Sequence, residues 1–209
     1  MSNDVKLISI CGTSSTGKSS VISCLHEKLG EKWIIFSTDS YLKMLGSEYT
    51  KFFDNMSIND DIKSDSSYFE KNDFYYLEEE NGNISCKYGK KAIDLFNTIP
   101  DAVSLLLNAG FYVILEAFVE TKGHIEFMKS KFADFKSVFI YFKASKEDLQ
   151  KREIKRQNRL IGTANSWLSD FTCEEKSDII IDTSQILPNE VAHILQRQLK
   201  ENFSISFKE

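Results

Sequence analysis

The stretch that decides the fold is "VKLISICGTSSTGKSS", residues 5–20. It begins with a short apolar run and continues with "GTSSTGKS" (12–19), which matches the pattern G-x-x-x-x-G-K-[ST] in full. Four constrained positions at average residue usage give a chance match of about 1% in a chain of this length. The pattern also has the context it requires, an apolar strand before it and a helical repeat after it. We therefore predict a phosphate-binding loop and not an ordinary turn rich in Ser and Thr.

Each fixed position of this loop has a chemical reason. Glycines let the backbone curl so that successive N–H groups point at phosphate oxygens. Lys18 reaches the β- and γ-phosphates, Ser19 offers its hydroxyl to Mg²⁺, and the helix that follows presents its positive N-terminal end. The residues predicted to bind the nucleotide here are Gly12, Thr13, Ser14, Ser15, Thr16, Gly17, Lys18, Ser19 and Ser20.

Short apolar runs alternate with helical patterns along the chain, which is typical of a parallel sheet covered on both faces. The predicted strands are residues 5–11, 33–37, 111–118, 137–144 and 178–182. The predicted helices are residues 18–30, 91–110 with a break or kink near Pro100, 124–132, 145–160 and 189–203. We therefore expect a single α/β domain of the P-loop NTPase class over residues 1–209, with ligands at the edge where the strands end.

The composition is that of an ordinary globular protein and argues against several classes. With 26 Lys and Arg against 31 Asp and Glu, the net charge of −5 argues against a protein that coats nucleic acid or an anionic membrane. No apolar stretch approaches the roughly 18 residues that span a bilayer, and the first residues do not resemble a signal peptide. The four cysteines form no C-x-x-C pair. We expect a cytoplasmic protein with reduced cysteines.

The segment of about 47–90 does not follow the alternation of strands and helices. It is rich in acidic residues, carries eight aromatic residues before position 77, and contains a turn signal in "ENGN" (80–83). We interpret it as an insertion over the ligand-binding edge of the sheet. Its Tyr and Phe side chains either line a pocket for a flat or apolar acceptor or pack a small core of the insertion itself.

Two acidic residues follow predicted strands. Asp39, in "FSTDSY" (36–41), lies where a carboxylate can accept a proton from an acceptor hydroxyl and direct its oxygen at a γ-phosphate. The alternative is that Asp39 or Ser40 only caps the next helix. Glu116, in "LEAF" (115–118), occupies the place of a Walker B carboxylate and either holds a water bound to Mg²⁺ or helps to orient the acceptor.

A basic helix is predicted after the fourth strand, in a segment of about 145–165. Arg152, Arg156 and Arg159 are spaced i, i+4 and i+7, so they line one helical stripe. Guanidinium groups there can cover a triphosphate and neutralise charge as the phosphoryl group moves. The alternative is a solvated basic face. Next to a phosphate-binding loop, we interpret this segment as an arginine-bearing lid.

The remaining motifs separate the classes of nucleotide-binding protein. The D-x-x-G and N-K-x-D motifs of Ras-type GTPases do not occur in the sequence, and the chain is short for a motor or an AAA-type ATPase. A phosphate-binding loop, a substrate pocket and an arginine-bearing lid are the parts of a small kinase.

These motifs, in this order, resemble the chloramphenicol phosphotransferase-like family of P-loop kinases. The similarity covers the loop, "WIIFSTDS" (33–40), the acid that ends the third strand, "R-E-x-x-R-x-x-R-x-x-G-x-A" and a late "DIIIDTS" (178–184). It implies a sheet like that of nucleoside-monophosphate kinases and transfer of the γ-phosphate of ATP to a hydroxyl of the antibiotic. It also implies Asp39 as the base, Arg152, Arg156 and Arg159 around the phosphates, and Asp182 and Thr183 near the adenine.

Two departures from the family concern the acceptor. Family members tend to have two consecutive acids after the third strand, whereas Ala117 follows Glu116 here, and the aromatic insertion has no family counterpart. We therefore expect an ATP- and Mg²⁺-dependent kinase of a small-molecule hydroxyl, with a chloramphenicol-like antibiotic or a related metabolite as acceptor. The alternatives are a nucleoside, nucleotide or RNA-end kinase, and a nucleotide-binding regulatory module that transfers no phosphate.

Overall fold

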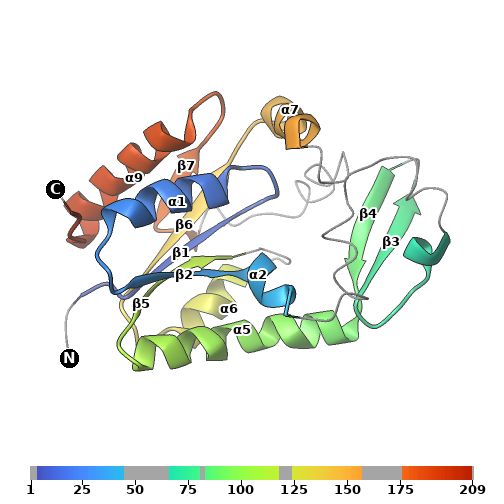
Figure 1. Cartoon of the computed structure of the whole chain (residues 1–209), viewed down its shortest axis with the longest axis horizontal. Coiled ribbons are helices and arrows are strands. Elements are labelled where there is room, and N and C mark those ends of the chain that lie inside the picture. Colours follow the sequence, from blue (N-terminus) through green and yellow to red (C-terminus); the bar gives the residue numbers. More distant parts are fainter. Residues whose placement is uncertain (1–3, 45–65, 81–82, 118–123, 157–175, 209) are drawn as a thin grey trace.

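Five parallel strands form the central sheet, in the order β2-β5-β1-β6-β7 (Figure 1). The computed structural model describes residues 4–44, 66–80, 83–117, 124–156 and 176–208. Each predicted strand is confirmed, with ends within two residues of those expected. The strands are β1 (Leu7–Gly12), β2 (Trp33–Ser37), β5 (Tyr112–Glu116), β6 (Ser137–Lys143) and β7 (Ile179–Asp182).

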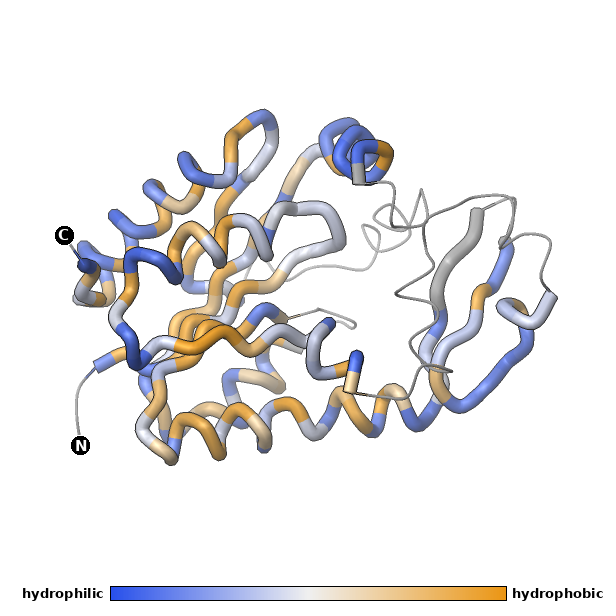
Figure 2. The backbone as a smooth tube through the Cα atoms, viewed as in Figure 1, coloured by the Kyte–Doolittle hydropathy of each residue, from blue (hydrophilic) through white to orange (hydrophobic). Residues whose placement is uncertain are grey.

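Helices cover both faces of this sheet, as continuous apolar strands require. On one face α1 (Lys18–Lys28) and α9 (Pro188–Phe203) pack on alternate residues of β1, such as Ile8. On the other face α5 (Lys90–Asn108) and α6 (His124–Lys131) pack on the intervening residues, such as Leu7. Figure 2 shows the apolar strands of the sheet between these two layers.

The break or kink expected near Pro100 is not found as a break, because α5 continues as one helix through this residue. A proline inside a helix removes one backbone hydrogen bond and costs about 3 kcal/mol in an isolated helix. Pro100 is buried together with Ile99 and Val103 on the face that packs against the sheet. Burial of this apolar stripe holds the helix together where local sequence alone favours interruption.

The described part of the insertion is a small unit with its own core. Its elements are a 3-10 helix η1 (Ser66–Phe69) and the antiparallel strands β3 (Tyr75–Glu80) and β4 (Asn83–Tyr88), which pair across the predicted turn. Tyr88 contacts both Tyr75 and Phe96 edge to face, each with ring centroids 5.3 Å apart. Of the two roles proposed for the aromatic residues, packing of the insertion's own core is found for Tyr68, Phe69, Phe74 and Tyr75, whereas the half-buried Tyr76 is not a member of that core. Tyr49, Phe52 and Phe53 lie outside the described residues.

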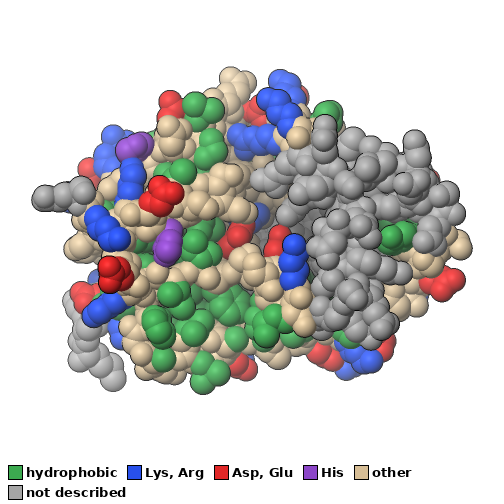
Figure 3. Space-filling view, in the orientation of Figure 1, with side chains coloured by type: hydrophobic (Ala, Val, Ile, Leu, Met, Phe, Trp, Pro, Cys, Tyr) green, Lys and Arg blue, Asp and Glu red, His purple; other side chains and the backbone are tan. Residues whose placement is uncertain are grey.

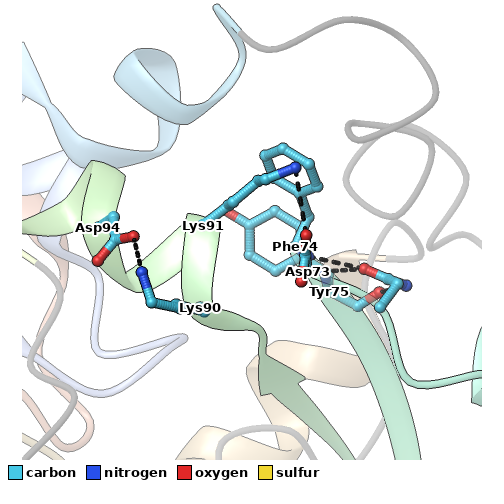
Figure 4. A network of polar contacts seen from close by, with 7 residues as sticks. Asp73, Phe74, Tyr75, Lys90, Lys91 and Asp94 are labelled. Atoms are coloured by element: carbon cyan, nitrogen blue, oxygen red, sulfur yellow. Dashed lines mark hydrogen bonds and ion pairs between the residues drawn. The ribbon is translucent and has the colours of Figure 1, made fainter.

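The unit is joined to the start of α5 by the ion pair between Lys91 Nζ and Asp73 Oδ2, 3.2 Å apart (Figure 4), and by a tight backbone contact. The side-chain oxygen of Asn72 accepts the N–H groups of Phe74 and Tyr75, and the Asp73 carbonyl accepts the N–H of Lys91 at 2.8 Å. A Cβ atom on Gly89 would collide with the backbone of residues 72–73. The hairpin and α5 therefore meet where only glycine fits.

On the outer surface, hydrophobic side chains gather on the face over α5 and β2, where Ile35 and Leu105 are exposed (Figure 3). Within the part of the chain that the structure describes, no helix is both long and apolar enough to cross a membrane.

Candidate nucleotide-binding and phosphotransfer site

The candidate site lies at the edge of the sheet where the parallel strands end. All neighbouring strands in the sheet are parallel, so their carboxyl ends meet at one edge. The predicted functional residues end or follow β1, β2, β5 and β7, or lie on α7 (Lys146–Arg156), which follows β6. This edge therefore gathers residues that are far apart in the sequence.

The loop after β1 has the backbone that its glycines predict. Gly12 has a φ of 151° and Gly17 a φ of 91°, both values that side chains rarely adopt. A Cβ atom on Gly12 would also collide with the carbonyl oxygen of Phe142 in β6. Ser15 has a φ of 65°, and its Oγ is buried with no hydrogen-bond partner among the residues that the structure describes. A left-handed serine with an unsatisfied hydroxyl is a strained feature, and strain of this kind concentrates at functional sites.

Lys18 begins α1 and reaches back to the loop. Its Nζ donates hydrogen bonds to the carbonyl oxygens of Gly12 and Thr13, at 2.8 and 2.9 Å. The hydroxyl of Thr16 donates to the same Thr13 carbonyl at 2.9 Å. The four residues between Gly12 and Gly17 are all buried. The loop is thus ordered by its own contacts, with the ammonium group beside the backbone that would hold the phosphates.

Ser19 and Glu116, the two predicted metal residues, are in direct contact. The Ser19 hydroxyl donates to Oε1 of Glu116 at 2.5 Å. A hydroxyl and a carboxylate are the oxygen ligands that Mg²⁺ prefers. Among the described residues there is no group of three or more His, Cys, Asp and Glu side chains that could hold a metal ion. A hydroxyl and a carboxylate in contact are compatible with Mg²⁺, which commonly takes further ligands from water and nucleotide phosphates.

Asp39 lies close to this pair along the edge. It is in the first turn of α2 (Thr38–Leu42), just beyond Ser37, which is the register partner of Glu116. The Thr38 hydroxyl donates to the carbonyl oxygen of Glu116 at 2.8 Å, which ties the start of α2 to the end of β5. The N-cap of α2 is Ser37, so neither Asp39 nor Ser40 is the cap residue. Thr38 was not predicted, although it lies next to Asp39 in the sequence.

The basic residues of α7 fall into two groups. Lys146, Lys151 and Lys155 are exposed, and Figure 3 shows Lys and Arg side chains over this helix. Arg152 is half-buried and turned inward: its Nη1 lies 3.3 Å from the Ser15 carbonyl oxygen, within the phosphate-binding loop. The three lysines therefore form a solvated basic face, which was the alternative to an arginine-bearing lid, and Arg152 is not part of that face. The side chain of Arg156 and all of Arg159 lie outside the described residues.

The turn after β7 also contacts the loop. The Thr183 hydroxyl donates to the Thr16 carbonyl at 2.9 Å, and the residue is buried. Asp182 is exposed, and its Oδ1 accepts the N–H of Ser184 at 2.9 Å. The pKa of this carboxyl is lowered below its ordinary value of 3.8, first by the hydroxyl of Ser184 and then by its N–H. Ser184 is the last residue of the "DTS" (182–184) that the resemblance places near the adenine, but its hydrogen bond to Asp182 was not predicted.

Hydrogen bonds thus join the phosphate-binding loop to Glu116, Arg152 and Thr183, and strand register places Asp39 beside Glu116. The catalytic and nucleotide-binding roles of these residues are proposals.

The sequence matches the family described as "Chloramphenicol phosphotransferase-like protein" over residues 5–200. This match covers most of the chain, so the chain belongs to that family, and the resemblance drawn from the motifs is confirmed. No significant match was found among curated proteins.

Solved structures with the same fold are kinases and related proteins of low sequence identity. A sugar kinase from Janibacter sp. HTCC2649 has a TM-score of 0.63 at 10% identity, with 97% of this chain and 98% of that chain covered. A gluconokinase from Sinorhizobium meliloti has a TM-score of 0.59 at 12% identity, with 94% and 93% covered. A tunicamycin resistance protein from Deinococcus radiodurans has a TM-score of 0.56 at 14% identity, with 97% and 98% covered. At such identities the similarity establishes the fold, which is that of P-loop kinases.

Proposed function

We propose that this member of the chloramphenicol phosphotransferase-like family transfers the γ-phosphate of ATP, bound with Mg²⁺, to a hydroxyl group of a small molecule. One observation carries the proposal: Ser19 of the loop donates to Glu116 of β5, and Asp39 follows the strand paired with Glu116. A loop, a metal-binding pair and a candidate base at one sheet edge are the parts that phosphoryl transfer needs.

In this proposal each residue has one chemical task. Asp39 accepts the proton of the acceptor hydroxyl, and the freed oxygen attacks the γ-phosphorus. The bond from that phosphorus to the bridging β,γ-oxygen breaks, and ADP leaves with the electron pair. Lys18 stabilises the charge that develops on the transferred group. Mg²⁺, held by Ser19 and Glu116, would neutralise charge on the phosphates.

The arginines on and after α7 are proposed to divide their work. Arg156 and Arg159 stay the candidates for covering the triphosphate, because they continue the helical stripe that begins at Arg152. Arg152 itself is already bonded to the loop backbone at Ser15. We therefore propose that Arg152 holds the backbone of the loop and does not cover the triphosphate.

The acceptor is proposed from the family and the insertion. The family description names chloramphenicol phosphotransferase, and the similar structures include kinases of a sugar and of gluconate and a protein of tunicamycin resistance. These names support a small hydroxyl-bearing acceptor, a chloramphenicol-like antibiotic or a related metabolite. A cytoplasmic location, where ATP and Mg²⁺ are abundant, stays our expectation.

The test of the acceptor uses γ-labelled ATP and Mg²⁺ with chloramphenicol and, in parallel, with a mixed pool of metabolites and nucleosides. Label in small molecules is separated by chromatography and identified by mass. Label on chloramphenicol would establish the acceptor, and label on a nucleoside would favour the nucleoside-kinase alternative. Nucleotide binding with neither transfer nor hydrolysis would contradict the proposal and favour a regulatory module.

A further inference from the structure

The Thr183 hydroxyl is the meeting point of three elements. Its oxygen lies 2.9 Å from the Thr16 carbonyl oxygen and 3.2 Å from the Lys143 carbonyl oxygen at the end of β6, so its single proton is shared between them. The same oxygen accepts Nη1 of Arg152 at 3.1 Å, while Nη2 of Arg152 donates to the Thr183 carbonyl. One buried hydroxyl thus joins the phosphate-binding loop, the sheet edge and α7.

The neighbouring serine extends this junction to the beginning of α7. The Ser184 hydroxyl oxygen accepts the N–H of Ser145 at 2.8 Å. The Ser145 hydroxyl oxygen in turn accepts the N–H of Asp148 at 3.2 Å, in the first turn of the helix. The turn after β7 therefore fixes both the start of α7 and the side chain of Arg152 on its second turn.

These contacts involve two consecutive peptide units of the loop, Ser15–Thr16 and Thr16–Gly17. A trans peptide points its N–H opposite to its C=O. Arg152 holds the Ser15 carbonyl and Thr183 holds the Thr16 carbonyl. The N–H groups of Thr16 and Gly17, which share those two peptide units, must then point away from α7 and β7. Backbone N–H groups are what such a loop offers to phosphate oxygens, so their direction sets the affinity.

The local backbone needs outside support to keep this arrangement. Ser15 has a left-handed φ of 65°, and within the described part of the chain its buried hydroxyl has no hydrogen-bond partner. Both features favour relaxation of the loop to another conformation. The bonds from Arg152 and Thr183 to the flanking carbonyls oppose that relaxation.

We propose that Thr183 is a positioning residue: its hydroxyl, acting with Arg152, orients the N–H groups of Thr16 and Gly17 for the phosphates. The inference rests on the proposed function and deepens it. Thr183 is 2% exposed and its hydroxyl already serves three partners, so it acts through the loop and not by contact with the nucleotide. Affinity for ATP, and not the rate of transfer, depends on it.

The test compares Thr183→Val, which removes the hydroxyl at nearly constant volume, with Thr183→Ser, which keeps it. Calorimetric titration with Mg·ATP gives the Kd, and steady-state transfer with the acceptor pool gives KM and kcat. We expect Thr183→Val to raise Kd and KM about tenfold, the worth of one buried hydrogen bond, while kcat changes less than about threefold. Thr183→Ser should have a Kd and a KM within about threefold of wild type. Ser130→Ala, which removes an exposed hydroxyl on α6, is the control for loss of a hydroxyl away from the site.

A double-mutant cycle tests the joint action. Arg152→Met and Thr183→Val act on adjacent peptide units, so their effects on the Kd should not add. The double variant should bind Mg·ATP little worse than the single variant that has the higher Kd. Additive losses would mean that Arg152 contacts the nucleotide by itself and would overturn the inference. If Thr183→Val does not fold, Thr183→Ala, which also removes the hydroxyl, takes its place in the cycle, with the same tenfold rise in Kd.

The other outcomes separate the inference from the proposed function. An unchanged Kd in Thr183→Val, or a lower kcat with unchanged Kd, overturns the positioning role while phosphotransfer stands. A wild-type protein that binds no Mg·ATP overturns the proposed function, and the positioning role with it.

Discussion

The hydroxyl of Ser19 lies 2.5 Å from Oε1 of Glu116, although the two residues are 97 positions apart in the chain. The contact exists because β1 and β5 are neighbours in the sheet, so that the loop after one strand meets the end of the other. It joins the part of the molecule that would hold the phosphates to the part that would hold Mg²⁺. The same edge carries Asp39, in the first turn of α2.

Glu116→Gln is predicted to weaken the binding of Mg²⁺ to this pair. The amide keeps the shape of the side chain but removes its negative charge, which Mg²⁺ favours. We expect the Mg²⁺ concentration for half-maximal transfer to rise about 10–100-fold. The measurement is a titration of transfer rate against Mg²⁺ at fixed ATP. Glu126→Gln, an exposed acid on α6, is the matched control, and equal Mg²⁺ dependence in the two variants would exclude Glu116 from the metal site.

Gly12→Ala is predicted to destabilise the whole fold. The new methyl group would meet the carbonyl oxygen of Phe142, and alanine would have to adopt a φ of 151°. We expect a loss of about 3 kcal/mol in the free energy of unfolding, because neither the strand nor the loop can yield. Gly30→Ala is the control, since a Cβ there meets no atom and its φ is ordinary. Urea denaturation compares the two, and equal midpoints would show that the loop adapts.

The sequence was sufficient to predict the sheet, because strand identity depends on local apolar runs that a parallel sheet requires. It also predicted the loop, whose glycines are fixed by backbone geometry at Gly12 and Gly17. The break or kink that it predicted near Pro100 is not present as a break, since local propensity there is outweighed by tertiary packing of Ile99 and Val103 against the sheet. The contact of Thr38 with Glu116 could not be predicted, because it depends on the register between β2 and β5.

Asp182 is predicted to stabilise the fold only above acidic pH. Its pKa is lowered in the folded protein by the hydroxyl and the N–H of Ser184, so the folded state binds its proton more weakly than the unfolded chain does. This contribution is complete above the ordinary pKa of 3.8 and is lost as pH falls through the lowered value. Thermal unfolding of wild type and Asp182→Asn between pH 6 and about pH 3 should show a difference in Tm that shrinks with acid. Asp134→Asn, on an exposed residue, is the control; a constant difference for Asp182→Asn would contradict the assignment.

Gly89→Ala is predicted to loosen the hairpin without affecting the nucleotide site. A Cβ at Gly89 collides with the backbone of residues 72–73, so the contact of β3 and β4 with α5 must open. Hydrogen exchange of residues 75–80 should become faster, while exchange in β1 and the Kd for Mg·ATP stay within about threefold of wild type. Slow exchange in β1 serves as the internal reference. A large loss of nucleotide affinity would instead show that the hairpin supports the loop.

The roles of single residues at the site were less predictable than their location. Arg152 was expected on a stripe over the phosphates, and its spacing says nothing of the Ser15 carbonyl to which it is bonded. Thr183 was expected near the adenine, and its contact with Thr16 depends on β6 and β7 being neighbours. Side-chain roles of this kind follow from which strands lie side by side, and residue spacing does not contain that information.

The central claim is that Asp39 is the base of a phosphoryl transfer for which Lys18 and its loop bind ATP. The most direct measurement compares Kd for Mg·ATP with the rate of label transfer from γ-labelled ATP in wild type, Lys18→Ala and Asp39→Asn. We predict that Lys18→Ala weakens binding, whereas Asp39→Asn binds ATP as wild type does and transfers at least about 100-fold more slowly. Full transfer by Asp39→Asn would contradict the account.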